Sequence, residues 1–218
     1  MEINDSSRSH YCLQRELNTA LGRAGQVASH WLDDRPAYIS TKTTGSGEFA
    51  QVIEIALLDA DQSVIYHSQI QPSVAIDKDA ELTHGINLSS LQGRPTWPDI
   101  IGRLKQLLVG RKVIIFDAIF ETRILKQSCQ AYALDIEWVD ALSVNCAMYL
   151  SANAYGSDNR YGTTSISHAL QKAQVSQVSA NSGAVASCYA LIKLVAITAD
   201  YARVRREMLE ELSLKIAV

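Results

Sequence analysis

Three apolar runs with short polar connections lie between residues 37 and 72, and they constrain the fold more than any other part of this 218-residue chain. In order, the runs read AYIST, AQVIEIALLDA and SVIYHSQIQP. The Gly and Thr cluster after the first run and DADQ after the second are typical of turns. The third run alternates apolar and polar residues, as an antiparallel strand does. The sequence therefore predicts a meander of three antiparallel strands.

Beyond this meander, helices alternate with shorter apolar runs. Residues 97–109 predict a helix, because their apolar side chains share one face and Pro98 suits a first turn. KVIIFD at 112–117 is a continuous apolar run, which is typical of a buried parallel strand. The other predicted elements are a helix at 119–133, a strand at EWVDAL (137–142), a polar loop at 153–164, a helix at 165–172 and a helix from Gly183 to the C-terminus. This order predicts an α/β fold with one mixed central sheet of five strands, flanked by helices.

The N-terminal part of the chain predicts a helical extension. Residues 11–32 place apolar side chains at roughly helical spacing, and DDRP then ends the helix, because proline disfavours helix at the residue before it. We expect residues 1–35 to form this extension and residues 36–200 to form the main domain. Residues 201–218 should continue from that domain as a C-terminal helix. The segment 74–95 predicts a loop with one helical turn.

Composition and charge narrow the function classes only slightly. Hydrophobic residues make up 47% of the chain and charged residues 20%, as in an ordinary globular domain. The formal net charge is −3, so any contact with phosphates must come from a local site. The four cysteines include no CxxC pair, and no apolar run approaches the roughly 20 residues that span a bilayer. We expect a reduced cytoplasmic protein that does not contact a membrane.

One short motif carries a specific resemblance. The segment YISTKTTG at 38–45 is similar to the end of the first strand of DnaQ-like (DEDD-type) 3′–5′ exonucleases, which reads Asp-x-Glu-Thr-Thr-Gly. Ser40 stands at the aspartate and Lys42 at the glutamate, while Thr43, Thr44 and Gly45 match the family. THGIN at 83–87 resembles a later Ile-His-Gly-Ile-Thr segment of the same family.

Two further motifs extend the resemblance over about residues 20–200. VIIFDAIFETRIL places Asp117 at the asparagine of the second motif and Glu121 at its catalytic aspartate, and it keeps Phe120. SGAVAS at 182–187 resembles the third motif, with Ser182 at the histidine and Ser187 at the aspartate. KQSCQAYAL at 126–134 looks like one bacterial and phage branch of the family. The resemblance implies a ribonuclease H-like fold.

The same alignment of motifs implies a degenerate catalytic site. The family cleaves with two divalent cations held by several carboxylates. Of the catalytic positions Ser40, Lys42, Glu121, Ser182 and Ser187, only Glu121 is acidic. One carboxylate cannot compensate two divalent cations. We therefore expect no cofactor, with Mg²⁺ or Mn²⁺ needed only if activity is retained.

Lys42 leads to a structural prediction. We expect its ammonium to pair with Glu121, and with Asp117 as well, and so to replace the metal electrostatically. Asp117 and Glu121 are spaced one helical turn apart, so they are weak candidates for a single metal. The alternative is an ordinary solvated pair.

The resemblance also supplies candidate nucleotide-binding residues, namely Thr43, Thr44, Gly45, His84 and Phe120. Each has a structural alternative. The Thr-Thr-Gly segment is also a tight turn between strands, Phe120 is also a core side chain, and a loop histidine such as His84 more often makes a structural hydrogen bond.

Three hypotheses of function remain open at this stage. The first is a pseudonuclease that binds single-stranded nucleic acid, 3′ ends or a protein partner without cleavage; the Thr-Thr-Gly turn and Phe120 favour it. The second is a regulatory or interaction protein that keeps only the scaffold, with a partner or homodimer surface; the net charge favours it. The third is an active exonuclease with rearranged acids, such as Asp117, Glu121 and Asp140.

Overall fold

A five-stranded sheet with the order β3-β2-β1-β4-β5 organises the middle of the chain. The structure is a computed structural model that describes residues 5–175 and 183–216. Its residues group into two compact units. The sheet unit comprises Arg35–Ala147 and Gln177–Ile192, and the helical unit comprises Met1–Asp34, Met148–Ser176 and Lys193–Val218.

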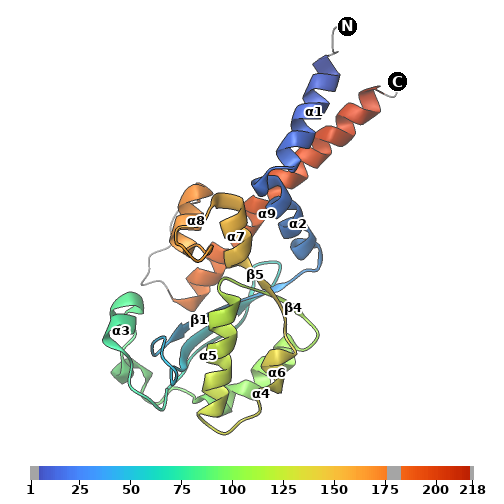
Figure 1. Cartoon of the computed structure of the whole chain (residues 1–218). Helices are drawn as coiled ribbons and strands as arrows, with labels where there is room; N and C mark the ends of the chain where they lie inside the picture. Colours follow the sequence, from blue (N-terminus) through green and yellow to red (C-terminus); the bar gives the residue numbers. More distant parts are fainter. Residues whose placement is uncertain (1–4, 176–182, 217–218) are drawn as a thin grey trace. The chain divides into compact units, whose positions relative to one another are not determined.

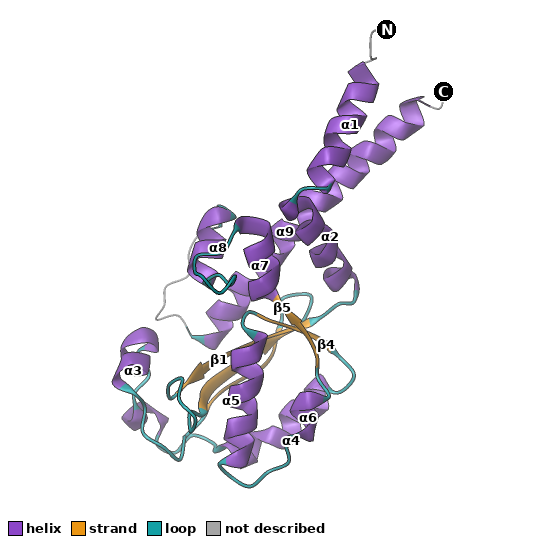
Figure 2. Ribbon diagram, in the orientation of Figure 1, coloured by secondary structure: helices purple, strands orange, loops and turns teal. Residues whose placement is uncertain are grey.

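The sheet is mixed, as its sequence patterns predict (Figure 2). Strands β1 (Ala37–Thr43), β2 (Val52–Leu58) and β3 (Val64–Gln69) form the antiparallel meander. Strands β4 (Lys112–Ile115) and β5 (Ser143–Cys146) continue the sheet on the other side of β1, parallel to it and to each other. The predicted ribonuclease H-like α/β class with five strands is confirmed.

Helices α4 (Trp97–Leu108) and α5 (Ala118–Gln130) pack against one face of this sheet (Figure 1). Their apolar stripes and the inward side chains of β1, β2 and β4 form one hydrophobic cluster. Thr96 and Asp99 start α4 with a capping box, which satisfies backbone N–H groups that a helix leaves free. The packing of α5 fixes the place of the residues at its start.

The predicted strand at 137–142 is wrong. Residues Glu137–Asp140 form the short helix α6, and β5 begins at Ser143. Asp135 accepts a hydrogen bond from the backbone N–H of Glu137 at 2.9 Å, which favours a helical start. Trp138 and Val139 then pack into the core cluster. Such a short apolar stretch fits both helical and strand spacing, so its pattern alone was not decisive.

The segment 74–95 is more ordered than the single helical turn predicted for it. It contains α3 (Lys78–His84) and the 3₁₀ helix η1 (Leu88–Leu91). Gly85 ends α3 with a left-handed backbone (φ 74°), which glycine adopts without a steric penalty. This turn places His84 at the end of a defined helix rather than in a loop.

The N-terminal residues form two helices rather than the one predicted. Helix α1 covers Asp5–Leu17 and α2 covers Ala20–Asp33. Thr19 separates them, because its hydroxyl caps α2 by accepting a hydrogen bond from the N–H of Gly22 at 3.1 Å. The helical unit also contains most of α7 (Ala147–Tyr155), α8 (Ile166–Lys172) and the later part of α9 (Ala184–Ile216). The domain boundaries expected from the sequence stay a prediction.

Helix α9 is unusually long. Judged by length and composition alone, its segment Ala184–Lys215 is long and apolar enough to cross a membrane. Half of its most apolar window is buried in the protein, and core helices of globular proteins pass the same test. Length and composition therefore do not assign this helix to a membrane.

Gly25 offers a test of packing within the helical unit. A Cβ atom at this position would lie 2.6 Å from the carbonyl oxygen of Thr198 and 2.9 Å from the Cβ of Ala202. We expect Gly25→Ala to lower the free energy of unfolding by about 1–3 kcal/mol through overpacking. Urea denaturation followed by circular dichroism measures the change.

Gly102 is the matched control, because a Cβ atom there meets nothing within 4 Å. Gly102→Ala should stabilise α4 by about 0.5–1 kcal/mol, since alanine favours helix over glycine. Equal changes in the free energy of unfolding of the two variants would contradict close packing at Gly25.

Candidate functional site

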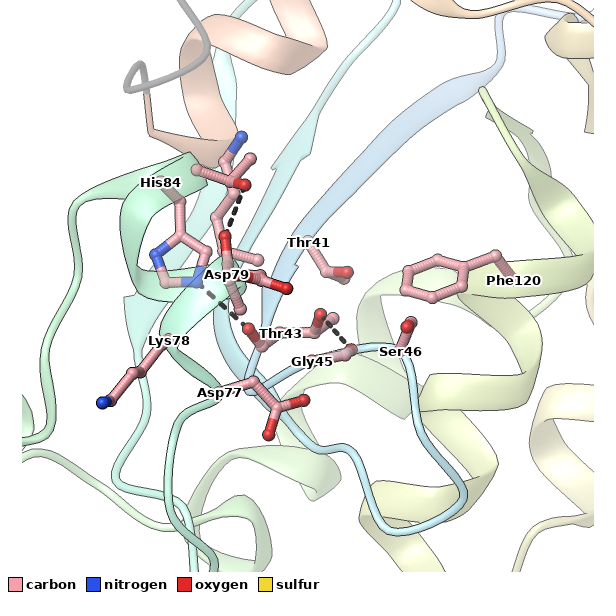
Figure 3. A pocket seen from close by; sticks show the side chains of 12 residues that line it. Thr41, Thr43, Gly45, Ser46, Asp77, Lys78, Asp79, His84 and Phe120 are labelled. Atoms are coloured by element: carbon pink, nitrogen blue, oxygen red, sulfur yellow. Dashed lines mark hydrogen bonds between the residues drawn. The ribbon is translucent and has the colours of Figure 1, made fainter.

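A pocket of about 490 Å³ opens where β1 ends, between α3 and the first turn of α5 (Figure 3). The end of β1 and the turn after it contribute Thr41, Lys42, Thr43, Gly45 and Ser46. The other side comes from Asp77 and from α3 up to His84, and Phe120 of α5 completes the lining. Figure 3 shows Phe120 and His84 on opposite sides of the pocket. We call it the β1 pocket.

Four of the five predicted nucleotide-binding residues therefore line one cavity, namely Thr43, Gly45, His84 and Phe120. Thr44 does not belong to the lining. It is 2% exposed, and its hydroxyl accepts a hydrogen bond from the N–H of Gln51 at 2.9 Å. Its backbone N–H donates to the carbonyl of Gln51 at 2.8 Å. Thr44 thus closes the β1–β2 connection and serves the turn.

Gly45 lies close to the side chain of Asp77. A Cβ atom there would lie 1.9 Å from a carboxylate oxygen of Asp77. The hydroxyl of Thr43 donates to the carbonyl of Gly45 at 2.7 Å, and the N–H of Asp77 donates to the carbonyl of Thr44 at 2.7 Å. The turn is therefore held tightly against the segment that leads into α3.

His84 makes structural hydrogen bonds with both ring nitrogens. Its Nδ1 accepts from the N–H of Ile86 at 3.0 Å, so the ring proton lies on Nε2, which donates to the carbonyl of Thr43 at 3.1 Å. Burial lowers the pKa of His84 below its ordinary value. A neutral imidazole thus joins the end of α3 to the end of β1 while one edge faces the β1 pocket.

Lys42 does not form the predicted ion pair with Glu121 or Asp117. Its ammonium donates to the hydroxyl of Ser187 on α9 at 3.1 Å. Burial lowers the pKa of Lys42, while the negative charges of Glu54 and Glu121 oppose that shift. The charges of Lys42 and Glu121 thus interact without direct contact.

Glu121 is hydrogen-bonded instead to Thr41, the residue before Lys42 on β1. One carboxylate oxygen accepts from the hydroxyl of Thr41 at 2.6 Å, and the other accepts from its backbone N–H at 3.4 Å. Successive side chains of a strand point to opposite faces, so the hydroxyl of Thr41 and the ammonium of Lys42 leave β1 on different sides of the sheet. The carboxylate of Glu121 thus has Thr41, rather than Lys42, as its hydrogen-bond partner.

Glu54 is a site residue to which the sequence alone assigned no chemistry. It is 4% exposed on β2 and lies directly opposite Lys42 in the β1–β2 register. One oxygen is 2.8 Å from Nε2 of His67, and the other accepts from the N–H of Ala184, the first residue of α9, at 3.1 Å. The signal was a single glutamate inside the apolar run VIEIALL, because a carboxylate buried in a strand needs partners.

The serines at the family's acidic positions have separate places. Ser187 lies one turn into α9 and accepts the hydrogen bond of Lys42. Ser40 is half-buried in β1, opposite Ala56 of β2. Ser182 lies outside the described residues. Neither described serine adds the negative charge that a metal ligand would bring.

Asp117 is a capping residue. Its carboxylate accepts from the N–H of Phe120 at 3.1 Å and so starts α5. Asp140 lies on α6, where it is exposed and pairs with Lys126. Across residues 5–175 and 183–216, no three His, Cys, Asp or Glu side chains gather as a metal site requires. The two divalent cations of the exonuclease family do not fit these side chains, because an ammonium and a hydroxyl stand among them.

The buried surroundings of Glu121 disfavour the charged form of its carboxyl group. Burial raises its pKa from the ordinary 4.5 to about 7, although the hydrogen bonds from Thr41 and the charge of Lys42 oppose the shift. The folded state therefore binds this proton more tightly than the unfolded chain does. The resulting stability is fully present below about pH 4.5 and is lost as the pH rises through about 7.

We expect Glu121→Gln to remove this dependence. Between pH 5 and pH 8, the free energy of unfolding of the variant should rise by roughly 2 kcal/mol relative to the unsubstituted protein, since one pKa unit corresponds to ~1.4 kcal/mol. Urea denaturation at both pH values measures it. Glu137→Gln, an exposed site on α6, reports the general effect of removing one negative charge. A difference that stays constant with pH would show that Glu121 is ionised throughout.

Comparison with known proteins gives relatives both by sequence and by fold. No protein-family model matches the chain. The chain is 31% identical over 140 residues to the uncharacterized exonuclease CP81 of Escherichia phage 186, a match that covers 62% of this chain and 72% of the phage protein.

Two solved structures share the fold. The nuclease domain of 3′hExo, a DEDDh family member bound to rAMP, has a TM-score of 0.57 at 12% identity, covering 75% of this chain and 90% of that one. Exonuclease X in complex with 5′ overhanging duplex DNA has a TM-score of 0.54 at 17% identity, covering 76% and 98%. At these identities the two structures show a common fold.

Proposed function

The chain belongs to the DnaQ-like, DEDD-type family of 3′–5′ exonucleases, and from this premise we propose that it is a member that binds nucleic acid ends without metal-dependent cleavage. The proposal has two parts. The first is that the catalytic centre has exchanged its metals for fixed protein groups. The second is that the β1 pocket still accepts a nucleotide.

Lys42 supports the first part of the proposal, the replacement of the metals by protein groups. Its partly buried ammonium contacts Ser187 and lies across the strand pair from the buried carboxylate of Glu54. A divalent cation between these groups would be repelled by the ammonium and would find few oxygen ligands with negative charge. The side chains thus compensate one another without a metal.

The β1 pocket supports the second part. Its volume of about 490 Å³ suits a small ligand, and it combines the Phe120 ring with the hydroxyls of Thr41 and Thr43. Aromatic side chains stack on bases of any sequence. The charged residues of the lining include both signs, Lys42 and Lys78 beside Asp77 and Asp79. Binding should therefore depend on stacking and hydrogen bonds more than on a field of positive charge.

The decisive experiment incubates the chain with labelled single-stranded DNA and RNA, with and without Mn²⁺. We expect a change in fluorescence anisotropy that depends only weakly on salt and does not require Mn²⁺, and no shortening of the strand on a denaturing gel. Mn²⁺-dependent shortening that Glu121→Gln abolishes would establish an active enzyme with rearranged acids instead.

Replacing the family's acids tests the metal argument directly. The triple variant Ser40→Asp, Lys42→Glu, Ser187→Asp should gain saturable Mn²⁺ binding in isothermal titration calorimetry, because it adds three carboxylates and removes the ammonium. The unsubstituted chain should show no saturable binding under the same conditions. Lys42→Met is the matched control, since it removes the positive charge without adding a ligand. Tight Mn²⁺ binding by the unsubstituted chain would contradict the proposal.

Phe120 tests the nucleotide pocket. We expect Phe120→Ala to weaken binding of a single-stranded oligonucleotide roughly 5- to 150-fold, since stacking of one base is worth about 1–3 kcal/mol. Ile119→Ala is the control, because Ile119 is the neighbouring residue on α5, is 64% exposed and does not line the pocket. Anisotropy titrations measure both affinities, and thermal unfolding confirms that both variants fold. Equal affinities would remove Phe120 from the binding site.

A second candidate function is an interaction protein that keeps only the exonuclease scaffold. The observation in its favour is that the helical unit exposes apolar side chains on α9, namely Val204, Met208 and Leu214, and also Tyr11 on α1. Failure of every labelled strand to bind in the experiment above would favour this function over the first.

A further inference from the structure

Two adjoining hollows lie beside α5, outside the β1 pocket. The first, here called the amide pocket, has a volume of about 420 Å³ and is lined by Phe49, Gln51, Ser73, Gln127 and Gln130 among others. The second, here called the cationic pocket, has the same volume and includes Arg123 and Lys126. The two share Glu48, Gln127 and Gln130, so they are continuous.

Helix α5 connects these hollows to the β1 pocket. Phe120, Arg123 and Gln127 are spaced three and four residues apart, so they lie along one face of the helix. Phe120 lines the β1 pocket, Arg123 the cationic pocket, and Gln127 both of the new hollows. Seven residues of helix rise about 10 Å. Three stacked nucleotides at about 3.4 Å each span the same length.

Arg123 offers a positive charge at the middle of this path. Its guanidinium donates to the carbonyls of Ser46 and Gly47, at 3.2 and 3.4 Å, and its centre lies 5.4 Å from the centre of the Phe120 ring. Among the described residues it makes no ion pair with a carboxylate. Because its hydrogen-bond partners are neutral carbonyls, the positive charge of this guanidinium is available to bind a phosphate.

The other charges of the cationic pocket are partly compensated. Lys126, three residues further along α5, pairs with Asp140. Glu48 is an exposed acid at the edge of both hollows. Arg123 is therefore the better candidate for the phosphate contact.

The amide pocket has the features of a base-binding site. Phe49 is 77% exposed at its edge and offers a ring for stacking. Gln51 is fixed by two bonds with Ser73: its amide N–H donates to the hydroxyl at 2.7 Å, and its oxygen accepts from the backbone N–H at 2.8 Å. The amide oxygen of Gln127 is buried and has no hydrogen-bond partner within the described part of the chain. A base that brings an amino group to this oxygen would satisfy it once the side chain turns toward the hollow.

We propose that these hollows form a second nucleotide subsite, which takes an internal nucleotide of a single strand whose 3′ end occupies the β1 pocket. Arg123 holds its phosphate, Phe49 stacks on its base, and Gln127 with Gln130 contacts the base edge. Glutamine pairs with the amino and ring nitrogens of adenine, so adenine is the preferred base. The inference rests on the proposed function and adds a substrate length and a base preference to it.

The test compares a labelled deoxyadenosine dinucleotide with labelled octamers of deoxyadenosine and thymidine by fluorescence anisotropy, using the full chain. The adenine octamer should bind roughly five- to tenfold tighter than either other ligand, as expected for one stacked and hydrogen-bonded base. Phe49→Ala and Gln127→Ala should remove this advantage and leave dinucleotide binding unchanged. Arg123→Gln should make the slope of log affinity for the octamer against log salt concentration less steep, by the amount expected for about one lost phosphate contact.

Val109→Ala is the matched control, because Val109 is 79% exposed at the end of α4 and lines neither hollow. Dinucleotide and octamers that bind with equal affinity, or variants that keep the full octamer advantage, would overturn the second subsite and leave the proposed function intact. Failure of the dinucleotide and both octamers to bind would overturn the proposed function itself, and the subsite with it.

Discussion

The carboxylate of Glu54, buried within β2, is the constraint on which the site depends. An uncompensated buried carboxylate costs several kcal/mol, so its partners are fixed in place around it. His67 of β3 and the first N–H of α9 bond to its two oxygens, and Lys42 of β1 lies opposite. A buried acid therefore joins three elements to β2. The start of α9, which brings Ser187 to Lys42, is positioned by the same bonds.

Burial, with the nearby negative charge of Asp117 adding to it, accounts for the state of Glu121. The charge of Lys42 and the hydrogen bonds from Thr41 oppose this effect but do not cancel it. Burial raises the pKa of Glu121 to about 7, so near neutral pH a large share of this carboxyl holds a proton. In a two-metal nuclease, cations compensate the carboxylates; in the proposed metal-free site, the ammonium of Lys42 and the proton on Glu121 would have that role.

The sequence predicted the parts of the fold that have a strong local period. The apolar runs predicted the meander and β4, and the apolar residues at helical spacing predicted α4. It failed at EWVDAL, too short for a distinct period, and at Thr19, whose cap interrupts an otherwise helical pattern. Motif spacing placed Lys42 at the end of β1, but not its contacts. Those depend on the β1–β2 register that sets Glu54 opposite Lys42, and on a hydrogen bond from Thr41 to Glu121, which no local pattern encodes.

The features shared with active exonucleases need not report on activity, because each has a structural reason. Gly45 lies against the side chain of Asp77 and His84 ties α3 to β1, while Asp117, which stands at the family's asparagine, caps the helix that presents Phe120. A chain keeps these residues as long as it keeps the turn and the pocket. Lys42 has no comparable reason, since a buried ammonium carries a desolvation cost that an apolar side chain would avoid. Its presence is explained by the carboxylate of Glu54, whose charge must be compensated whether or not a metal is bound.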